Sequence, residues 1–485
     1  MSLLGSDWEG RIWSNGWVEG HGGTRDVVSP ATGEVLGSIG LADSDDVAHA
    51  ARLATEAQRD WAARPYSERA AVLRKAGDLW LEHADEITGW LMRESGAIGP
   101  FGGFQISVSS EECYEAAGIA SLPYGELLRS ANPRLSMSRR IPVGVVGVIS
   151  PFNVPTILSI RAVAPALSLG NAVLLKPDPR TAVSGGVVLA AIFRAAGLPD
   201  GVLHVLPGDA TTGAALVADP QVPVISFTGS TRGGRSVAEL GARHLKRVHL
   251  ELGGNSALLV LDDVDVDQAS SVGAWGSFAH QGQVCMTTGR HLVMSGIADQ
   301  YVEALAARAD HLPVGDPTTG TVALGPVIDA GQRDRIHSMV TTTVAQGARL
   351  VAGGTYEDLY YRPTVLDAVP LDSPAYREEV FGPVAPVVRV HGLEQVIALA
   401  RDSSYGLSLG ILTNDVMRGL EIAEQVPTGL VHINDQTIND EATIPFGGLG
   451  ISGTGGRLGG PSANIEAFTH TQWVTARGTL PQYPF

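Results

Sequence analysis

The sequence predicts an α/β protein with two domains, each built on a largely parallel sheet, and a small β-ribbon. Short apolar runs alternate with helical segments of about 15 to 25 residues, a rhythm typical of βαβ units around a buried sheet. This rhythm occurs twice along a chain of 485 residues. At about 150 residues per domain, this length gives about three domains, or two large ones with an appendage.

Two helices are predicted before residue 140. Apolar residues at 47, 50, 51, 54 and 57 form one helical stripe after Ser44, and acidic residues occupy the first turn. A second helix is predicted to begin at Ser67. Its apolar residues are Ala70, Ala71, Leu73, Leu79 and Leu81.

Beyond residue 140, five apolar runs predict strands of a doubly wound domain. They are VGVVGVI at 143–149, AVLL at 172–175, VLHVL at 202–206, VISF at 224–227 and ALLVL at 257–261.

A second α/β unit follows this domain. Helices are predicted near 265–281, 297–310 and 329–346, and strands near 291–294, 386, 409 and 430. The flanking stretches RLSMSRRI and AFTHTQWVTARG alternate like exposed strands, and either a ribbon that pairs with another subunit or two ordinary edge strands would have this pattern. We therefore expect one domain over 1–133 and 142–253, a second over 254–450, and a ribbon from 134–141 and 466–485.

Composition excludes several classes of function. Lys and Arg number 34 and Asp and Glu 51, so the net charge of −17 repels nucleic acids and anionic lipid surfaces. Two cysteines cannot form a disulfide framework, the first residues do not resemble a signal peptide, and Pro and Gly interrupt the most apolar stretches. We expect a cytoplasmic protein without a membrane span, and the sequence indicates no metal site.

The segment VISFTGSTRGG at 224–234 runs from an apolar strand through a turn into a helix. Free backbone N–H groups at a helix N-terminus suit phosphate, although an ordinary strand-to-helix turn would look the same. The GxGxxG fingerprint after the first strand is absent.

Three residues are candidates for chemistry. Cys285 lies among small and polar residues in HQGQVCMTTGR, unlike Cys113, which fits an inert core thiol. Glu251 ends an otherwise apolar stretch, where a raised pKa would suit a general base and a structural ion pair is the alternative. Asn153 follows the strand at 143–149 and is either an oxyanion donor or a plain turn residue.

Seven ordered motifs together resemble the aldehyde dehydrogenase superfamily over essentially the whole chain. They are PFNVP, Lys176 in LLKPDPRTA, FTGSTRGG, ELGGN, GQVCMTTGR, EEVFGP at 378–383 and PFGGLGISGTG at 445–455. The resemblance implies a Rossmann-type cofactor domain, a second α/β catalytic domain and a β-ribbon for oligomerisation.

The resemblance also implies a mechanism. Cys285 would attack an aldehyde carbonyl, and the Asn153 side chain with the Cys285 backbone N–H would hold the oxyanion of the thiohemiacetal. Hydride transfer to a nicotinamide would leave a thioester, which water activated by Glu251 would hydrolyse to the acid.

The implied cofactor is NAD, with NADP possible because Pro179 stands where the family often has an acidic residue. Lys176 would reach the adenine ribose, Ser230 the pyrophosphate and Glu379 the nicotinamide ribose. Phe152 stands in place of the family's usual tryptophan, and Arg457 replaces a carboxylate sometimes assigned to a proton relay. The remaining implied cofactor residues are Ile149, Ser150, Pro151, Gly229, Leu252, Gly253 and Phe381.

Several motifs and the C-terminal segment resemble bacterial benzaldehyde and vanillin dehydrogenases, which implies an aromatic aldehyde substrate. A flat apolar slot would be formed by Val154, Val284, Met286, Ile438 and Phe446, with Arg161 as a partner for a ring substituent; ordinary core packing is the alternative for each. The alternatives in function are another aldehyde class, a CoA-acylating dehydrogenase, which typically lacks the Glu251 base, and a non-catalytic binding protein. A homodimer or homotetramer is expected.

Overall fold

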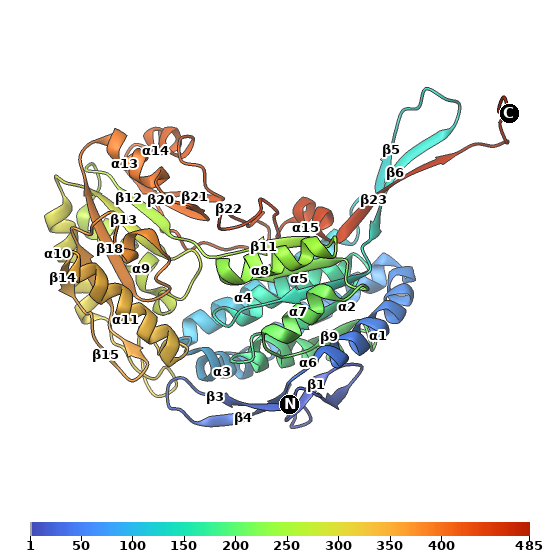
Figure 1. Cartoon of the computed structure of the whole chain (residues 1–485), viewed down its shortest axis with the longest axis horizontal. Coiled ribbons are helices and arrows are strands. Elements are labelled where there is room, and N and C mark those ends of the chain that lie inside the picture. The colour runs from blue at the N-terminus through green and yellow to red at the C-terminus, as the bar shows by residue number, and fades with distance from the viewer. Residues whose placement is uncertain (1) are drawn as a thin grey trace.

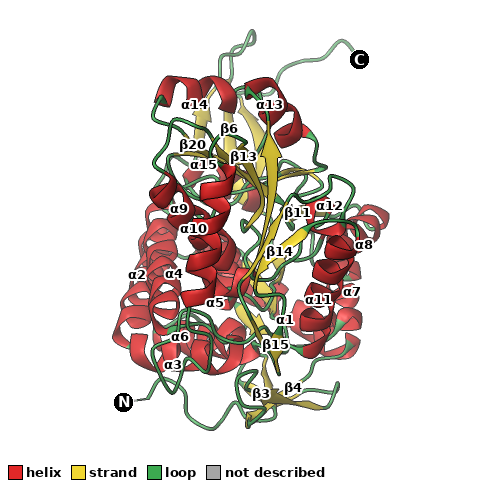
Figure 2. Cartoon of the chain, turned by 90° about the vertical axis from the view of Figure 1, so that its left-hand side faces the viewer, coloured by secondary structure: helices red, strands yellow, loops and turns green. Residues whose placement is uncertain are grey.

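Two seven-stranded sheets, one in each half of the molecule, dominate the structure (Figure 1). It is a computed structural model that describes residues 2–485. Helices surround both sheets (Figure 2). The helices are α1 (Ser44–Ala63), α2 (Tyr66–Glu82), α3 (Ala84–Ser95), α4 (Gly99–Ile119), α5 (Pro155–Ser168), α6 (Val188–Ala195), α7 (Ala210–Ala218), α8 (Thr231–Arg243), α9 (Val266–Phe278), α10 (Ala298–His311), α11 (Ala330–Ala345), α12 (Pro374–Arg377), α13 (Leu393–Arg401), α14 (Val416–Ala423) and α15 (Pro461–Phe468).

The first sheet has the strand order β11-β10-β7-β8-β9-β1-β2. Its first five strands are parallel, and β1 and β2 add an antiparallel edge. The strands are β1 (Arg11–Trp13), β2 (Trp17–Glu19), β7 (Val145–Ile149), β8 (Ala172–Lys176), β9 (Leu203–Val205), β10 (Val224–Thr228) and β11 (Arg247–Glu251).

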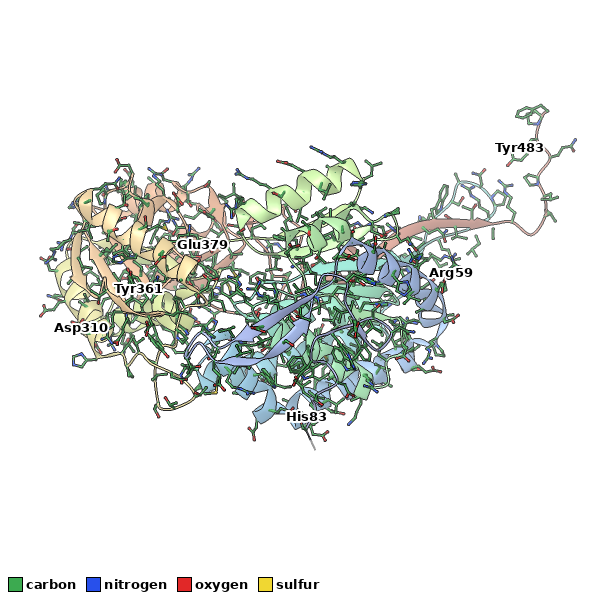
Figure 3. All side chains as sticks on the ribbon, turned by 60° about the horizontal axis from the view of Figure 1, so that its bottom comes forward. Arg59, His83, Asp310, Tyr361, Glu379 and Tyr483 are labelled. Atoms are coloured by element: carbon green, nitrogen blue, oxygen red, sulfur yellow. The ribbon has the colours of Figure 1, made fainter. Side chains whose placement is uncertain are left out.

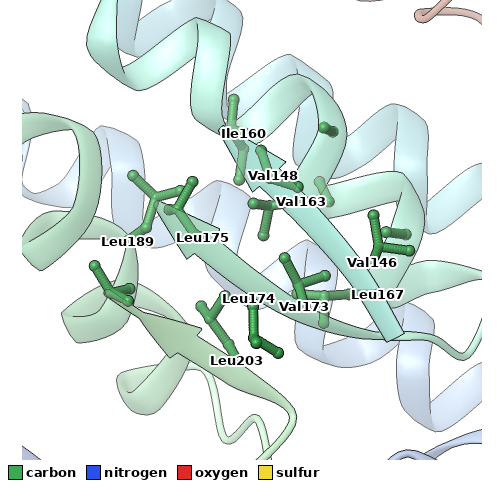
Figure 4. Packing of buried hydrophobic residues seen from close by; sticks show 14 of the residues in the cluster. Val146, Val148, Ile160, Val163, Leu167, Val173, Leu174, Leu175, Leu189 and Leu203 are labelled. Carbon is green, nitrogen blue, oxygen red and sulfur yellow. The ribbon is translucent and has the colours of Figure 1, made fainter. Parts of the chain in front are cut away.

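Every residue of β7 and β8 is buried, which explains why the two strands are nearly continuous apolar runs. Figure 4 shows Val146 and Val148 of β7 beside Val163 of α5, within the core that this sheet shares with its helices. Each such side chain stabilises the fold by about 1.5–3 kcal/mol relative to an exposed one.

The strand order reverses at β7, because β8 continues the sheet on one side and β10 on the other. The register aligns the carboxyl ends, pairing Ile149 with Lys176 and with Phe227, and Thr228 with Glu251. Sheets of this kind bind ligands in the crevice at such a switch point. The loops after β7, β10 and β11 therefore converge on one edge.

The second sheet has the order β14-β17-β18-β13-β12-β20-β21 and is parallel except for β14. Its strands are β12 (Ser256–Val260), β13 (Thr288–Met294), β14 (Arg349–Ala352), β17 (Thr364–Asp367), β18 (Val384–Val390), β20 (Ser408–Leu412) and β21 (Leu430–Ile433). Short pairs complete the set: β3 (Thr24–Val28) with β4 (Val35–Gly40), β15 (Tyr356–Glu357) with β16 (Tyr360–Tyr361), and β19 (Tyr405–Gly406) with β22 (Leu449–Gly450).

Two details of the sequence analysis were wrong. The run 257–261, grouped there with the strands of the first domain, forms β12 in the middle of the second sheet. The helix expected to reach residue 281 ends at Phe278, because His280, Gln281 and Gly282 all adopt the left-handed conformation, with φ of 51°, 57° and 65°.

A three-stranded ribbon projects from the body of the molecule (Figure 1). It consists of β5 (Gly125–Leu127), β6 (Leu135–Pro142) and β23 (Thr469–Ala476), so the two flanking stretches pair with each other, and β5 adds a strand that was not expected. Figure 3 shows Tyr483 beyond the ribbon, far from Glu379. None of the helices between residues 2 and 485 has the length and apolar character needed to span a membrane.

Candidate functional site

A cavity of about 680 Å³ opens where the loops after β7, β10 and β11 meet the second sheet. It brings together all three candidates for chemistry, Asn153, Glu251 and Cys285. Asn153 follows β7, Glu251 ends β11, and Cys285 lies in the loop that leads into β13. The first sheet thus supplies an amide and a carboxylate, and the second unit supplies a thiol.

The Cys285 side chain is partly exposed, whereas Cys113 is fully buried in α4, as expected for a core thiol. Burial and the nearby carboxylates of Glu379 and Glu251 raise the pKa of the Cys285 thiol. The thiol is therefore protonated in the free protein at neutral pH, and it must lose a proton before it can act as a nucleophile.

Asn153 is 4% exposed, and its side-chain Nδ2 donates a hydrogen bond to the backbone oxygen of Gln283 at 2.7 Å. An amide nitrogen carries two protons, so one remains for another acceptor. The bond fixes the plane of the Asn153 side-chain amide, because its acceptor, Gln283, lies only two residues before Cys285 in the chain. This arrangement suits a donor to an oxyanion that forms near the sulfur.

Glu251 is 6% exposed, and among residues 2–485 its Oε2 atom has no hydrogen-bond partner. Burial raises the pKa of Glu251 well above its usual 4.5, although Arg161 and Arg457 oppose the shift. A buried carboxylate with a free oxygen and a raised pKa is well suited to accept a proton near neutral pH. Among residues 2–485 this side chain does not form the ion pair considered as the alternative.

The N-terminus of α8 forms a cradle at one end of the cavity. Ser230 caps the helix by accepting a hydrogen bond from the Gly233 amide at 3.2 Å. Within the described part of the chain, the amides of Thr231 and Arg232 donate to no protein group, and both residues line the cavity. Two free amides and the helix dipole fit a pyrophosphate.

A partly buried carboxylate, that of Glu379, lines the same cavity. Glu379 accepts a hydrogen bond from the Gly254 amide at 3.3 Å, and burial raises its pKa to about 7. A Cβ on Gly253 would overlap this carboxylate, so a larger residue there would displace the Glu379 side chain. A carboxylate held in this way suits hydrogen bonds from a ribose diol.

Two aromatic rings lie beside this carboxylate. Phe152 and Phe381 meet edge to face with centroids 6.0 Å apart, and the Arg180 guanidinium lies 4.2 Å from the Phe152 centroid. Phe381 adopts a left-handed φ of 54°, and its carbonyl accepts a hydrogen bond from Gln332 at 2.7 Å. Strained residues held in this way cluster at ligand sites.

Three residues that the resemblance assigned to the cofactor do not line the cavity: Ile149, Ser150 and Lys176. The Ser150 hydroxyl shares a hydrogen bond with the Ser159 hydroxyl at 2.8 Å. Lys176 ends β8 at the same sheet edge, but it is 8% exposed and burial lowers the pKa of its amine. The other assigned residues line the cavity: Pro151, Phe152, Gly229, Ser230, Leu252, Gly253, Glu379 and Phe381.

A second cavity, of about 730 Å³, adjoins the same loops. Val154, Val284 and Met286 line it, so the chain neighbours of Asn153 and Cys285 face a different space from those two residues. Ile438 also lines it. The two loops therefore separate a polar cavity from an apolar one.

Sequence reasoning missed the aromatic residues of the second cavity. Phe101 and Phe104 come from α4, and Trp275 and Phe278 come from α9. Each pair has the i, i+3 spacing that places two side chains on one helix face, which is the signal that could have found them. Trp275 is 57% exposed and Phe104 41%, so the aromatic lining reaches the surface.

Arg161 and Phe446 line neither cavity. Arg161 Nε bonds Glu112 at 2.8 Å, and its Nη2 bonds Asp440 at 2.6 Å. Burial, which lowers the pKa of Arg161, is outweighed by Asp440 and Glu112, which raise it. Phe446 packs with Val284 and Met286, and the guanidinium lies 5.1 Å from its ring centroid.

Comparison with known proteins agrees with this geometry. The model of the family described as "Aldehyde dehydrogenase family" matches residues 17–474. The chain belongs to this family. It is 61% identical to vanillin dehydrogenase of Amycolatopsis sp. over 100% of both chains. It is 50% identical to benzaldehyde dehydrogenase [NAD(+)] of Pseudomonas putida, over 99% of this chain and 98% of that one.

Among solved structures, the chain resembles a salicylaldehyde dehydrogenase from Pseudomonas putida in complex with salicylaldehyde. The TM-score is 0.94 at 35% sequence identity, over 98% of this chain and 99% of the other. The fold predicted from the sequence is thus confirmed as that of an aldehyde dehydrogenase.

One departure of this aldehyde dehydrogenase from the family pattern lies beside Glu251. A Cβ on Gly447 would lie 2.8 Å from Arg457 Cδ and 3.0 Å from Glu251 Oε1. Gly447 therefore lies between the side chains of Arg457 and Glu251. The Arg457 guanidinium donates a hydrogen bond to the Gly447 carbonyl. A cation therefore stands near Glu251 where the family often has a carboxylate.

Proposed function

We propose that this aldehyde dehydrogenase oxidises an aromatic aldehyde to its carboxylic acid with NAD as the hydride acceptor. The observation that carries the proposal concerns the loop before β13 that bears Cys285, which we call the thiol loop. It separates an aromatic-lined cavity from a cavity with a phosphate cradle. The names of the vanillin, benzaldehyde and salicylaldehyde dehydrogenases support the substrate class, and the name of the benzaldehyde enzyme supports NAD.

The proposed chemistry begins with the thiol of Cys285, which loses its proton to solvent, after which the sulfur adds to the aldehyde carbon. The carbonyl oxygen becomes an oxyanion, and the free proton of Asn153 Nδ2 and the Cys285 backbone N–H stabilise it. NAD, when bound, would supply the hydride acceptor that allows the thiohemiacetal to become a thioester. Glu251 then takes a proton from water, and the resulting hydroxide attacks the thioester carbon. The C–S bond breaks, which releases the acid and leaves a Cys285 thiolate that recovers the proton from Glu251.

The dinucleotide is proposed to lie in the first cavity. The α8 cradle would hold the pyrophosphate, Glu379 the nicotinamide ribose, and Phe381 one side of the nicotinamide ring. The aldehyde ring would lie in the second cavity, against Phe101, Phe104 and Phe278. We assign no direct contact to Arg161, because it lines neither cavity. Its Nε and Nη2 atoms bind carboxylates, and its Nη1 atom has no partner among residues 2–485.

We further propose the domain division, assembly and location expected from the sequence. Residues 1–133 and 142–253 would bind the dinucleotide, residues 254–450 would carry the catalytic thiol, and the ribbon would pair with a second copy. The ribbon exposes Leu127 and Trp473, whose exposed fractions of 79% and 61% support that role. A reducing cytoplasm would keep the Cys285 thiol free.

Initial-rate kinetics with vanillin, benzaldehyde and hexanal, each with NAD and with NADP, test the proposed function. We expect kcat/KM for the two aryl aldehydes to exceed that for hexanal by about tenfold or more, because a flat ring fills an aromatic slot that a chain leaves partly empty. We expect NAD to give the higher kcat/KM. A preference for hexanal would contradict the substrate class, and turnover that requires CoA would contradict hydrolysis by Glu251.

Replacing Arg457 with Gln tests the charge beside the base. The pKa of Glu251 is raised, so the carboxylate that accepts the proton forms only as pH rises through that pKa. Removing the neighbouring cation should raise this pKa further and shift the acidic limb of the kcat profile to higher pH, by about 0.5 unit. Arg457→Lys keeps the charge and should leave the limb in place. A shift to lower pH would be inconsistent with this arrangement.

A further inference from the structure

The loop before Cys285 holds Asn153 at two points. His280 Nε2 lies 2.7 Å from the Asn153 backbone oxygen, and Asn153 Nδ2 lies 2.7 Å from the Gln283 backbone oxygen. The loop closes on itself because the backbone N–H of Gln283 donates a hydrogen bond to the His280 carbonyl at 3.0 Å. Both the backbone and the side chain of Asn153 are therefore attached to the segment that carries the thiol.

The protonation state of His280 is defined by its surroundings. Burial lowers its pKa to about 4, so the ring is neutral at physiological pH. A carbonyl oxygen only accepts hydrogen bonds, so the single ring proton is on Nε2 and points to Asn153. The ring also stacks on Phe101, with centroids 4.5 Å apart and planes 13° apart.

Packing alone does not account for a histidine at this position. The other ring nitrogen, Nδ1, is buried and has no partner among residues 2–485, and leaving such an acceptor unpaired is unfavourable. The backbone of His280 is also left-handed, which is unfavourable for a residue other than glycine. An apolar side chain would fill the same space without an unpaired nitrogen, so the Nε2–H group is the feature that the site uses.

We propose that His280 is a positioning residue that keeps the Asn153 amide aimed at the oxyanion beside Cys285. The inference rests on the proposed function, because it gives Asn153 the oxyanion. His280 borders the cavity proposed for the aldehyde ring, but in this scheme it touches neither the reacting carbonyl nor the dinucleotide. It acts through the Asn153 carbonyl, which fixes the turn after β7 against the thiol loop.

Replacing His280 with Met and with Gln gives a matched pair, because the two side chains are similar in size and only Gln carries an N–H donor. We expect H280M to lower kcat about 10- to 30-fold, which is less than the loss of a whole oxyanion donor, and to change the aldehyde KM less than about threefold. H280Q should recover most of kcat. Equal kcat values for the two variants would overturn the proposal.

A double variant separates positioning from a general structural role. If His280 acts through Asn153, adding H280M to Asn153→Ala should lower kcat no further, whereas independent effects would multiply. The rate of Cys285 alkylation by iodoacetamide should stay within about twofold in H280M, because displacement of iodide forms no oxyanion. Multiplying losses, or slowed alkylation, would refute the positioning role.

The matched control is His204→Phe. His204 is another fully buried histidine, and its Nε2 lies 3.0 Å from the Gly201 carbonyl in the core of the first sheet, away from both cavities. Its loss should leave kcat per folded molecule unchanged. Aldehyde turnover by the wild-type enzyme tests the proposed function separately, so a wild-type enzyme that is active and an H280M variant that matches it would reject only the inference about His280.

Discussion

Cys285→Ala should lower the rate of NADH formation from an aromatic aldehyde by about 10⁴-fold or more. Without the sulfur no thiohemiacetal forms, and the oxyanion donors and the base have no covalent intermediate to act on. The fold should persist, because Cys285 is partly exposed and the change removes one atom. Initial rates and the thermal unfolding midpoint measure the two effects separately.

Cys113→Ala is the matched control, because it removes the other cysteine of the chain. Cys113 is fully buried in α4, so its loss creates a small cavity and lowers the free energy of unfolding by about 1 kcal/mol. The kcat value per folded molecule should not change. NADH formation by C285A at a rate near that of the wild type would rule out the covalent mechanism.

Glu251→Gln should lower steady-state kcat about 10³-fold while the first turnover still releases about one NADH per active site. The amide cannot take a proton from water, so the thioester accumulates after hydride transfer. Gln has the same shape, and Oε2 of Glu251 has no partner among residues 2–485, so the substitution breaks no hydrogen bond of that atom. Stopped-flow absorbance measures the burst, and mass spectrometry of quenched enzyme detects the acyl group on Cys285.

Glu94→Gln serves as the control for this experiment. Glu94 is a fully buried carboxylate outside both cavities, and burial raises its pKa to about 7 although it accepts hydrogen bonds from Val183 and Ser184. Its replacement should reduce stability and leave the ratio of burst to steady-state rate unchanged. Loss of the burst in E251Q would place Glu251 before hydride transfer and contradict its assignment to thioester hydrolysis.

Much of the site was predictable because its residues follow strands with a clear signal. The apolar runs at 143–149 and 224–227 define parallel neighbours, and parallel strands end at the same edge. Asn153 and Ser230 therefore had to lie close together once both strands were recognised. Cys285 stood out because small and polar residues surround it, and Glu251 stood out because it ends an apolar stretch, but only the resemblance to a family connected them.

The remaining features depend on packing that a local pattern does not reveal. The sequence did not reveal that Glu112 and Asp440, 49 and 279 positions away in the chain, bind two of the three guanidinium nitrogens of Arg161. The aromatic cavity lining comes from α4 and α9, two helices far apart in the chain. The run at 257–261 looks the same in either sheet, and only the long-range pairing of β12 with β13 and β20 decides its position.

The separation of the two cavities by adjacent residues has an evolutionary consequence. Substitutions in Phe104 or Trp275 can reshape the cavity proposed for the aldehyde without touching a residue that lines the cavity proposed for the dinucleotide. Under that proposal, single changes on two helix faces alter the substrate range while the residues around Cys285 stay constant. An enzyme built in this way can acquire a new substrate without having to evolve its catalytic centre again.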